Sequence, residues 1–153
     1  MSDQIFGGRE ISHISLSCER YFDIGFGITD IGIQLTRLRP SRVFASIVLY
    51  FDAIRELYYY RVTRSSGQTY DVILIHLTDD NIYKRLYNIL DIPQENFDAE
   101  DVVHRYFRIY LSQQIDVQFI NQINQWLILC GRPFRFIELP QHLVDQLFDP
   151  SRL

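Results

Sequence analysis

The stretch YDVILIHLTDDNIYKRL, residues 70–86, passes from a strand pattern into a helix pattern within a few positions. Its first half is rich in aliphatic residues, and the run Val72–Ile75 is apolar at every position. A strand that is apolar on both faces is typical of the middle of a sheet, where both faces are covered. Thr78 and Asp79 are favoured just before a helix, so we expect a helix to begin there and to end before Pro93. The stretch therefore predicts a central strand followed directly by a helix.

The residues before this stretch alternate between apolar and polar side chains. Residues 11–18 show the period-two pattern of a half-buried strand. Similar alternation follows over residues 22–28 and 31–35, and its parity changes at Thr29–Asp30, which predicts a turn or a bulge. The first third of the chain is therefore predicted to be an antiparallel, β-rich unit.

Between residues 41 and 60 the apolar residues recur at helical spacing instead. Pro40 is tolerated at the first turn of a helix, and Ser41 can cap it. The apolar stripe comprises Val43, Phe44, Ile47, Val48, Phe51, Ile54, Leu57 and Tyr58. This pattern predicts a long amphipathic helix on which the N-terminal strands pack.

Three further helix patterns occupy most of the second half of the chain. Asp101 can cap a helix that reaches Leu111, and Asp116 can start another that Gly131 closes. A short strand, FRFIEL, then comes before a last helix over residues 140–148. The C-terminal half is therefore predicted to be helical.

These elements together predict an α+β fold. It consists of an N-terminal antiparallel β-rich third packed on a long amphipathic helix, one further central strand, and a helical C-terminal half. The length of 153 residues predicts a single globular domain, residues 1–153, because one core of this size buries about two thirds of the surface of the unfolded chain. The composition, with 47% hydrophobic and 22% charged residues, is that of a globular protein.

No apolar run reaches the length of a bilayer span, and the N-terminus lacks the pattern of a secretory signal. We therefore expect a soluble, cytoplasmic protein with no membrane contact. The net charge is -4 and the basic residues are scattered, which disfavours nucleic-acid binding. Cys18 and Cys130 lack the spacing of a metal site and are predicted to be buried thiols. No nucleotide-binding or metal motif is visible, so neither a cofactor nor a metal is expected.

Lysine is nearly absent from the chain. Of the 15 basic residues, only Lys84 is a lysine. Lysine is the residue to which ubiquitin and acetyl groups are attached, so one interpretation is a viral or bacterial protein that works inside a host cell and offers few attachment points. The alternative is a lineage bias in amino-acid usage.

Two histidines each have a hydroxyl residue two positions further on. Positions i and i+2 of a strand share a face, so His13 would lie beside Ser15 and His76 beside Thr78. These pairs resemble the paired histidine-x-threonine/serine motifs of the two-histidine phosphoesterase superfamily. The resemblance implies a phosphodiesterase acting on a small cyclic or oligonucleotide, with the two imidazoles as acid and base and the two hydroxyls holding the phosphate. The alternative is that both histidines are structural.

Tyrosines and arginines lie close together in the segments ELYYYRV and HRYFRIY. Tyrosine and arginine are enriched in protein interfaces. Helical spacing would bury part of each segment and leave Arg55, Tyr59, Arg105 and Arg108 exposed. These four residues are a predicted contact surface, with ordinary packing and surface ion pairs as the alternative.

The C-terminal segment FIELPQHLVDQLF places Leu139, Pro140, Leu143 and Leu147 at the start of an amphipathic helix. This Leu-Pro-x-x-Leu start is similar to the opening of an F-box helix and to the Leu-Pro end of a SOCS box. The similarity implies a ubiquitin-ligase adaptor role, which the lysine poverty would suit. The alternative is a terminal helix that docks on the core.

The sequence as a whole favours a non-enzymatic protein that works by protein contact or self-association, as a structural, assembly or host-directed factor. Catalysis generally requires several titratable groups gathered in one pocket, and only the two histidine pairs indicate such a grouping. The phosphodiesterase and the ubiquitin-ligase adaptor are the alternatives.

Overall fold

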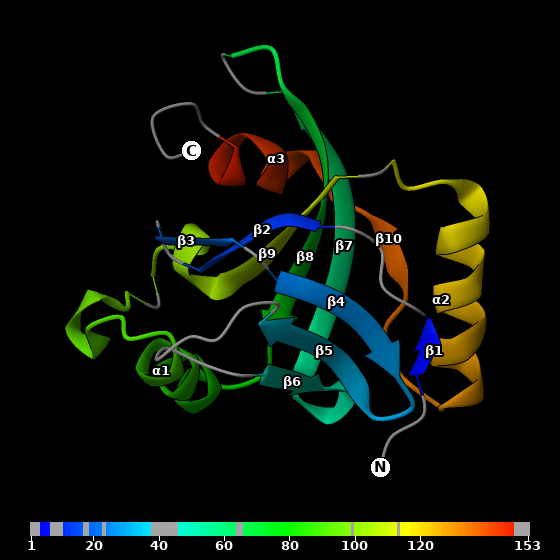
Figure 1. Ribbon diagram of the computed structural model, residues 1–153, viewed down its shortest axis with the longest axis horizontal. Helices are drawn as coiled ribbons and strands as arrows, with labels where there is room; N and C mark the ends of the chain where they lie inside the picture. Colours follow the sequence, from blue (N-terminus) through cyan, green and yellow to red (C-terminus); the bar gives the residue numbers. More distant parts are fainter. Residues whose placement is uncertain are drawn as a thin grey trace.

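The computed structural model (Figure 1) describes residues 4–6, 11–16, 19–22, 24–37, 46–63, 66–98, 100–112 and 114–148. Within these residues, ten strands form two sheets. The strands are β1 (Gln4–Phe6), β2 (Ile11–Leu16), β3 (Glu19–Phe22), β4 (Ile24–Thr29), β5 (Gly32–Arg37), β6 (Ser46–Tyr50), β7 (Ile54–Thr63), β8 (Thr69–Leu77), β9 (Tyr106–Leu111) and β10 (Phe136–Glu138). The helices are α1 (Asp80–Ile89), α2 (Val117–Leu129) and α3 (Gln141–Leu147), with short 3-10 turns η1 (Phe51–Ala53), η2 (Gln94–Asn96) and η3 (Val102–Arg105).

The four-stranded sheet has the order β1-β4-β5-β6, and the six-stranded sheet has the order β10-β7-β8-β9-β2-β3. All neighbouring strands are antiparallel except β10, which pairs with β7 in parallel. Figure 1 shows the four-stranded sheet lying across one face of the six-stranded sheet. The described part of the chain is thus a two-sheet α+β structure, and no helix within it has the length and apolar character needed to cross a membrane.

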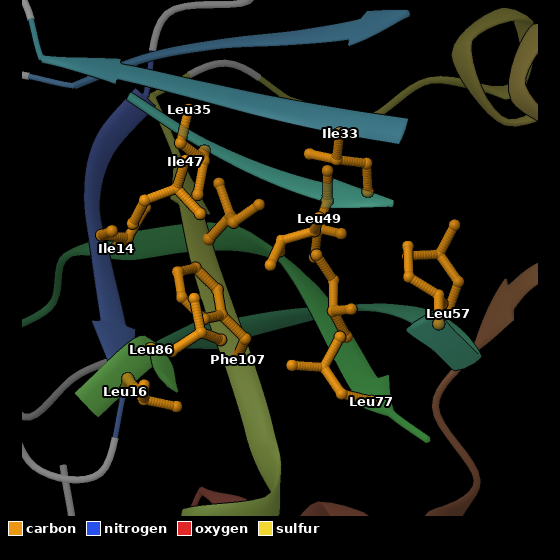
Figure 2. Close-up of a cluster of buried hydrophobic side chains, with 14 of the residues drawn as sticks. Ile14, Leu16, Ile33, Leu35, Ile47, Leu49, Leu57, Leu77, Leu86 and Phe107 are labelled. Atoms are coloured by element: carbon orange, nitrogen blue, oxygen red, sulfur yellow. The ribbon is translucent and has the colours of Figure 1, made fainter. Parts of the chain in front are cut away.

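The main hydrophobic core lies between the two sheets. Figure 2 shows Leu35 and Ile47 of the smaller sheet and Ile14 and Phe107 of the larger sheet pointing into this layer. Apolar residues of α1 and α2 belong to the same core, so these two helices complete it. A second, smaller core covers the other face of the six-stranded sheet, where α3 packs.

The predicted central strand is confirmed. β8 pairs with β7 on one side and β9 on the other, and every residue from Tyr70 to Leu77 is buried, as its two-sided apolar pattern requires. The helix after it is also confirmed as α1, with Asp79 as its N-cap. The turn at Thr29–Asp30 joins β4 to β5, and the Thr29 hydroxyl accepts from the backbone N–H of Gly32.

The predicted long helix over residues 41–60 is wrong over its described part. Residues 46–63 form β6, the turn η1 and β7. Of the apolar positions that suggested one helix face, those from Ile47 onward lie in β6, η1 and β7, and β6 and β7 belong to different sheets. Val43 and Phe44 lie outside the described residues. The segment is rich in β-branched and aromatic residues, which pack well on a pleated surface. Pairing with β8 along most of its length also satisfies the backbone of β7.

The C-terminal half is less helical than predicted. The segment expected to be a helix reaching Leu111 forms η3 and then β9, which lies between β8 and β2. All six residues of β9 are buried, because both faces of this strand are covered. A sequence that is apolar on every side cannot distinguish a buried strand from a buried helix by its spacing. The predictions of α2, β10 and α3 are confirmed.

Candidate functional site

The side chains of His13 and His76 lie on the same face of the six-stranded sheet. In β2 and β8 the neighbours Ile14 and Ile75 belong to the core between the sheets. Because side chains alternate along a strand, both histidines point to the opposite face, where α3 packs. Both histidines of the predicted phosphodiesterase motifs therefore lie on one face of this sheet.

The two histidines lie far apart on that face. His13 is paired with Tyr110 of β9, and Tyr110 is paired with Val72 of β8. His13 is therefore two strands away from β8 and four residues along it from His76. With strands ~4.8 Å apart and ~3.3 Å per residue, the Cα atoms of the histidines are roughly 16 Å apart. The structure does not bring the two histidine pairs together around one phosphate.

His13 and Ser15 take part in internal packing. The His13 ring is only 1% exposed, stacks on Tyr110 at a centroid distance of 4.3 Å, and meets Tyr70 edge-on at 5.6 Å. The Ser15 hydroxyl accepts a hydrogen bond of 2.9 Å from the guanidinium of Arg108. Arg108 also donates to the backbone oxygen of Val103 at 3.0 Å.

The predicted exposure of Arg108 is wrong, because this side chain is only 4% exposed. Residues of β9 alternate between the two faces of the sheet, and both faces are covered. The guanidinium is therefore buried together with hydrogen-bond acceptors that satisfy it.

His76 belongs to a different group of side chains, in which both of its ring nitrogens have partners. Nδ1 lies 3.3 Å from the Glu56 carboxylate, and Nε2 lies 3.2 Å from the guanidinium of Arg105. A guanidinium can only donate hydrogen bonds, so Nε2 is the acceptor and the proton sits on Nδ1, which donates to Glu56. This arrangement is that of a neutral imidazole.

Burial lowers the pKa of His76, and the positive charges of Arg105 and Arg55 lower it further. The hydrogen bond and charge of Glu56 act in the opposite direction but do not reverse the shift. Burial raises the pKa of Glu56, but hydrogen bonds from Tyr58 and His76 outweigh it, so its net pKa is lowered. Near neutral pH the group therefore holds one carboxylate, one neutral imidazole and two guanidinium groups.

Two tyrosines complete this group. The Tyr58 hydroxyl donates to the Glu56 carboxylate, and burial together with that bond raises its pKa. The Tyr106 ring lies 5.1 Å from the His76 ring and 6.4 Å from the Tyr58 ring. Burial and the nearby Glu56 charge raise the pKa of Tyr106 to about 12. We call the six residues Arg55, Glu56, Tyr58, His76, Arg105 and Tyr106 the Tyr–Arg cluster.

Tyr83 of α1 holds the backbone of the cluster in place from the other side of the sheet. Its hydroxyl accepts a hydrogen bond of 2.8 Å from the backbone N–H of Leu77, next to His76. The same hydroxyl donates to the backbone oxygen of Arg105. One buried side chain thus ties the end of β8 to the end of η3, which fixes the two backbones that carry His76 and Arg105.

The other predicted site residues have different positions. Thr78 is exposed, and its backbone N–H bonds to Ala53; the helix cap is Asp79, whose carboxylate accepts from Asn81 at 2.7 Å. Tyr59 points to the opposite side of β7 from Tyr58 and packs on Phe136 at a ring distance of 5.0 Å.

The C-terminal segment packs on the sheet. Leu139 and Leu147 are buried in the second core, while Pro140 and Leu143 are partly buried. Phe148 stacks on Tyr60 of β7 at 5.6 Å. The terminal helix therefore docks on the core, as the structural alternative predicted.

A separate polar cavity of about 330 Å³ lies near the hairpin of β7 and β8. It is lined by Arg61, Thr69, Asp71, Leu111, Ser112 and Gln114. The Arg61 guanidinium bonds to the Asp71 carboxylate at 2.8 Å, and that carboxylate also accepts from the backbone N–H of Ile115 at 2.5 Å. The Asp71 carboxylate thus forms an ion pair with Arg61 and also binds the backbone of the loop before α2.

Cys130 is a free, partly buried thiol, and Cys18 lies outside the described residues. Among the residues whose positions are described, no group of three or more histidine, cysteine, aspartate or glutamate side chains could hold a metal ion. In comparisons with known proteins, no family model, no curated protein and no solved structure matches this chain.

The sequence identified only Arg55, His76 and Arg105 of the cluster. Glu56, Tyr58 and Tyr106 were missed because the segments ELYYYRV and HRYFRIY, which contain them, were interpreted as helices. Read with a period of two, ELYYYRV places Glu56, Tyr58 and Tyr60 on one face and Leu57 and Tyr59 on the other. That alternation is the signal that could have found them.

Proposed function

We propose that the protein acts by binding another protein, without catalysis, and that the Tyr–Arg cluster is part of the contact surface. The observation that carries this proposal is the position of Arg55 and Arg105. Arg55 is exposed and its charge acts on Glu56 and His76, while Arg105 is half-buried and its guanidinium bonds to His76. Arginine and tyrosine are the residue types that most often dominate the binding energy of an interface.

The cluster is also rigid before any partner binds. Its residues lie on paired strands and on the end of η3, and Tyr83 ties two of these backbones together. A contact surface that is already ordered loses little conformational entropy on binding. This supports a recognition role for a site built on strands.

The charge of the cluster indicates the kind of partner. The cluster contains two guanidinium groups and one carboxylate, and His76 is neutral, so the cluster is positive although the chain has a net charge of -4. A positive patch attracts a negative one and directs the encounter between the two proteins. The proposed partner therefore presents an acidic segment with side chains that pack on Tyr58.

The state of His76 supports a binding role over the phosphodiesterase alternative. A general base needs a ring nitrogen that is free to take a proton from the substrate. Both nitrogens of His76 have partners, and a guanidinium covers Nε2. The distance of roughly 16 Å to His13 also leaves the second imidazole out of reach.

The test is affinity capture with the tagged protein after mild cross-linking, with the double variant Arg55→Ala/Arg105→Ala. The matched control is Arg85→Ala, which removes an exposed arginine from α1. We expect a partner that is retained by the wild type and the control and lost with the double variant. With that partner purified, the double variant should weaken binding by at least about 2 kcal/mol. A set of bound proteins that is the same for all three forms contradicts the proposal.

A further inference from the structure

The side chain of Arg105 is held by one hydrogen bond. Its guanidinium donates to Nε2 of His76 at 3.2 Å, and within the described part of the chain no other hydrogen bond or ion pair holds it. Its backbone is fixed separately, because the Tyr83 hydroxyl donates to its carbonyl oxygen. Arg105 is half-buried at the end of η3, so its guanidinium can reach water without any change in the backbone. The direction of this guanidinium therefore depends on a single acceptor, the ring nitrogen of His76.

This acceptor exists only while the imidazole is neutral. The proton of the neutral ring is on Nδ1, which bonds to Glu56 at 3.3 Å, and Nε2 offers its lone pair to Arg105. A second proton takes this lone pair, and both ring nitrogens then donate. Two donors, each on a positively charged group, would face each other where the hydrogen bond had been. Protonation of His76 thus removes the bond to Arg105 and replaces it with repulsion.

Three elements present charged or titratable groups to the His76 ring. These groups are Arg55, Glu56 and Tyr58 from β7, Arg105 from η3, and Tyr106 from β9. Both tyrosines have a raised pKa and stay uncharged, and the pKa of Glu56 is lowered, so its carboxylate stays ionised in mild acid. Helix α3 packs on the same sheet face, but its titratable residues His142 and Asp145 are exposed. In this group only His76 changes its charge between neutral and mildly acidic pH.

We propose that protonation of His76 releases Arg105, so that the pair is a pH-sensitive switch within the Tyr–Arg cluster. The imidazolium keeps its Nδ1–H bond to Glu56, which now joins two opposite charges. The new Nε2–H points to the place that the guanidinium has left, and water takes that place. Arg105 turns towards solvent. The cluster then holds three positive groups and one carboxylate, instead of two and one.

The role of this switch in regulation rests on the proposed function. A released Arg105 has all its N–H groups available for a carboxylate of the partner. The additional positive charge also strengthens the attraction for an acidic segment. Mild acid should therefore tighten the contact by about two- to fivefold, the effect of one further charge that is screened by solvent and salt.

The test is NMR of the free, nitrogen-15-labelled protein over a series from about pH 7.5 to about pH 5. At the neutral end we expect His76 with its proton on Nδ1 and a resolved guanidinium signal of Arg105, because the bond hinders rotation of the group. This signal should broaden and disappear with the same midpoint as the titration of His76. In His76→Gln an amide oxygen can accept from Arg105 at every pH, so the signal should no longer depend on pH.

Two variants should move the midpoint of the His76 titration in opposite directions. Arg105→Met removes a positive charge that opposes protonation, so the pKa of His76 should rise. Glu56→Gln removes the carboxylate that stabilises the imidazolium, so the pKa should fall. The control Arg85→Ala removes an exposed arginine of α1 and should leave the midpoint unchanged. His104→Gln removes a second titratable residue of η3, and the release of Arg105 should persist in it.

An Arg105 signal that persists through the titration of His76, or a neutral His76 with its proton on Nε2, overturns the switch. Both results come from the free protein, so they do not depend on the proposed function. With the purified partner from the capture experiment, the wild type should bind more tightly below the midpoint than at neutral pH, and His76→Gln should bind equally at both. An affinity of the wild type that does not change with pH overturns the regulatory role. A capture experiment that finds no partner counts against the proposed function alone.

Discussion

The guanidinium of Arg105 donates a hydrogen bond of 3.2 Å to Nε2 of His76. The two residues are far apart in the sequence, on η3 and β8, and meet because β9 places the end of η3 beside the end of β8. This bond determines the tautomer of His76 and covers the ring nitrogen that a catalytic base would use.

The first prediction concerns Tyr83. Tyr83→Phe removes the hydroxyl that joins the backbones of Leu77 and Arg105, and it leaves a buried N–H group without its acceptor. We expect a loss of ~1–3 kcal/mol of unfolding free energy in urea denaturation. The pKa of His76, followed by NMR titration, should rise, because a loosened Arg105 no longer opposes protonation. An unchanged pKa would show that Tyr83 does not position Arg105.

The second prediction is that stability falls as the pH is lowered below neutral. The folded pKa of His76 is lowered, so below pH ~6.5 the unfolded chain binds a proton that the folded protein does not, and unfolding is favoured. The folded pKa of Glu56 is also lowered, so its contribution is present above its unfolded pKa and is lost as pH falls through the folded pKa.

The measurement is the free energy of unfolding at a series of pH values for the wild type and His76→Gln. The variant should lose the part of the pH dependence that lies just below pH ~6.5, while the part at lower pH persists. Equal curves for both proteins would mean that His76 does not titrate differently in the folded and unfolded states.

The third prediction uses the ends of α1 and α2, which have the same backbone geometry. In each, the residue after the C-cap has a positive φ, 60° at Asp91 and 68° at Gly131. Glycine adopts this conformation without steric cost, whereas other residues do not. We expect Asp91→Gly to stabilise the protein and Gly131→Ala to destabilise it, each by about 1 kcal/mol in thermal unfolding. Changes of the same sign in both variants would contradict this account.

The fourth prediction concerns the close approach of β5 and β6. Gly32 is paired with Tyr50, and a methyl group at residue 32 would collide with the carbonyl oxygen of Leu49. Gly32→Ala should therefore cost about 1–3 kcal/mol, because backbone atoms must move apart. Ser46→Ala, at an exposed position of β6, is the control and should change the melting temperature little. A Gly32→Ala protein as stable as this control would show that the strands can separate freely.

Much of the fold could be predicted from local sequence patterns. The apolar run Val72–Ile75 predicted the central strand, because a strand that is buried on both faces is apolar at every position, whereas a half-exposed strand alternates. Asp116 and Gly131 predicted the ends of α2 because capping depends on the residue at the cap itself. At these positions the residues themselves favour a single backbone conformation.

The errors lie where the sequence has two favourable interpretations. The segment from Ser46 to Thr63 has helical spacing and strand propensity together, and pairing with β8 and the four-stranded sheet decided between them. The candidate site depended on that decision, because Glu56 and Tyr58 share a face with each other only if β7 is a strand.

The sequence by itself thus determined the α+β class, the central strand with its following helix, and the two ends of α2. Only the tertiary structure decided that His76 lies between Glu56 and Arg105, and that His13 lies on the same sheet face but far away. The physical reason is that strand pairing joins residues that are distant along the chain. No local pattern records which strand will lie beside which.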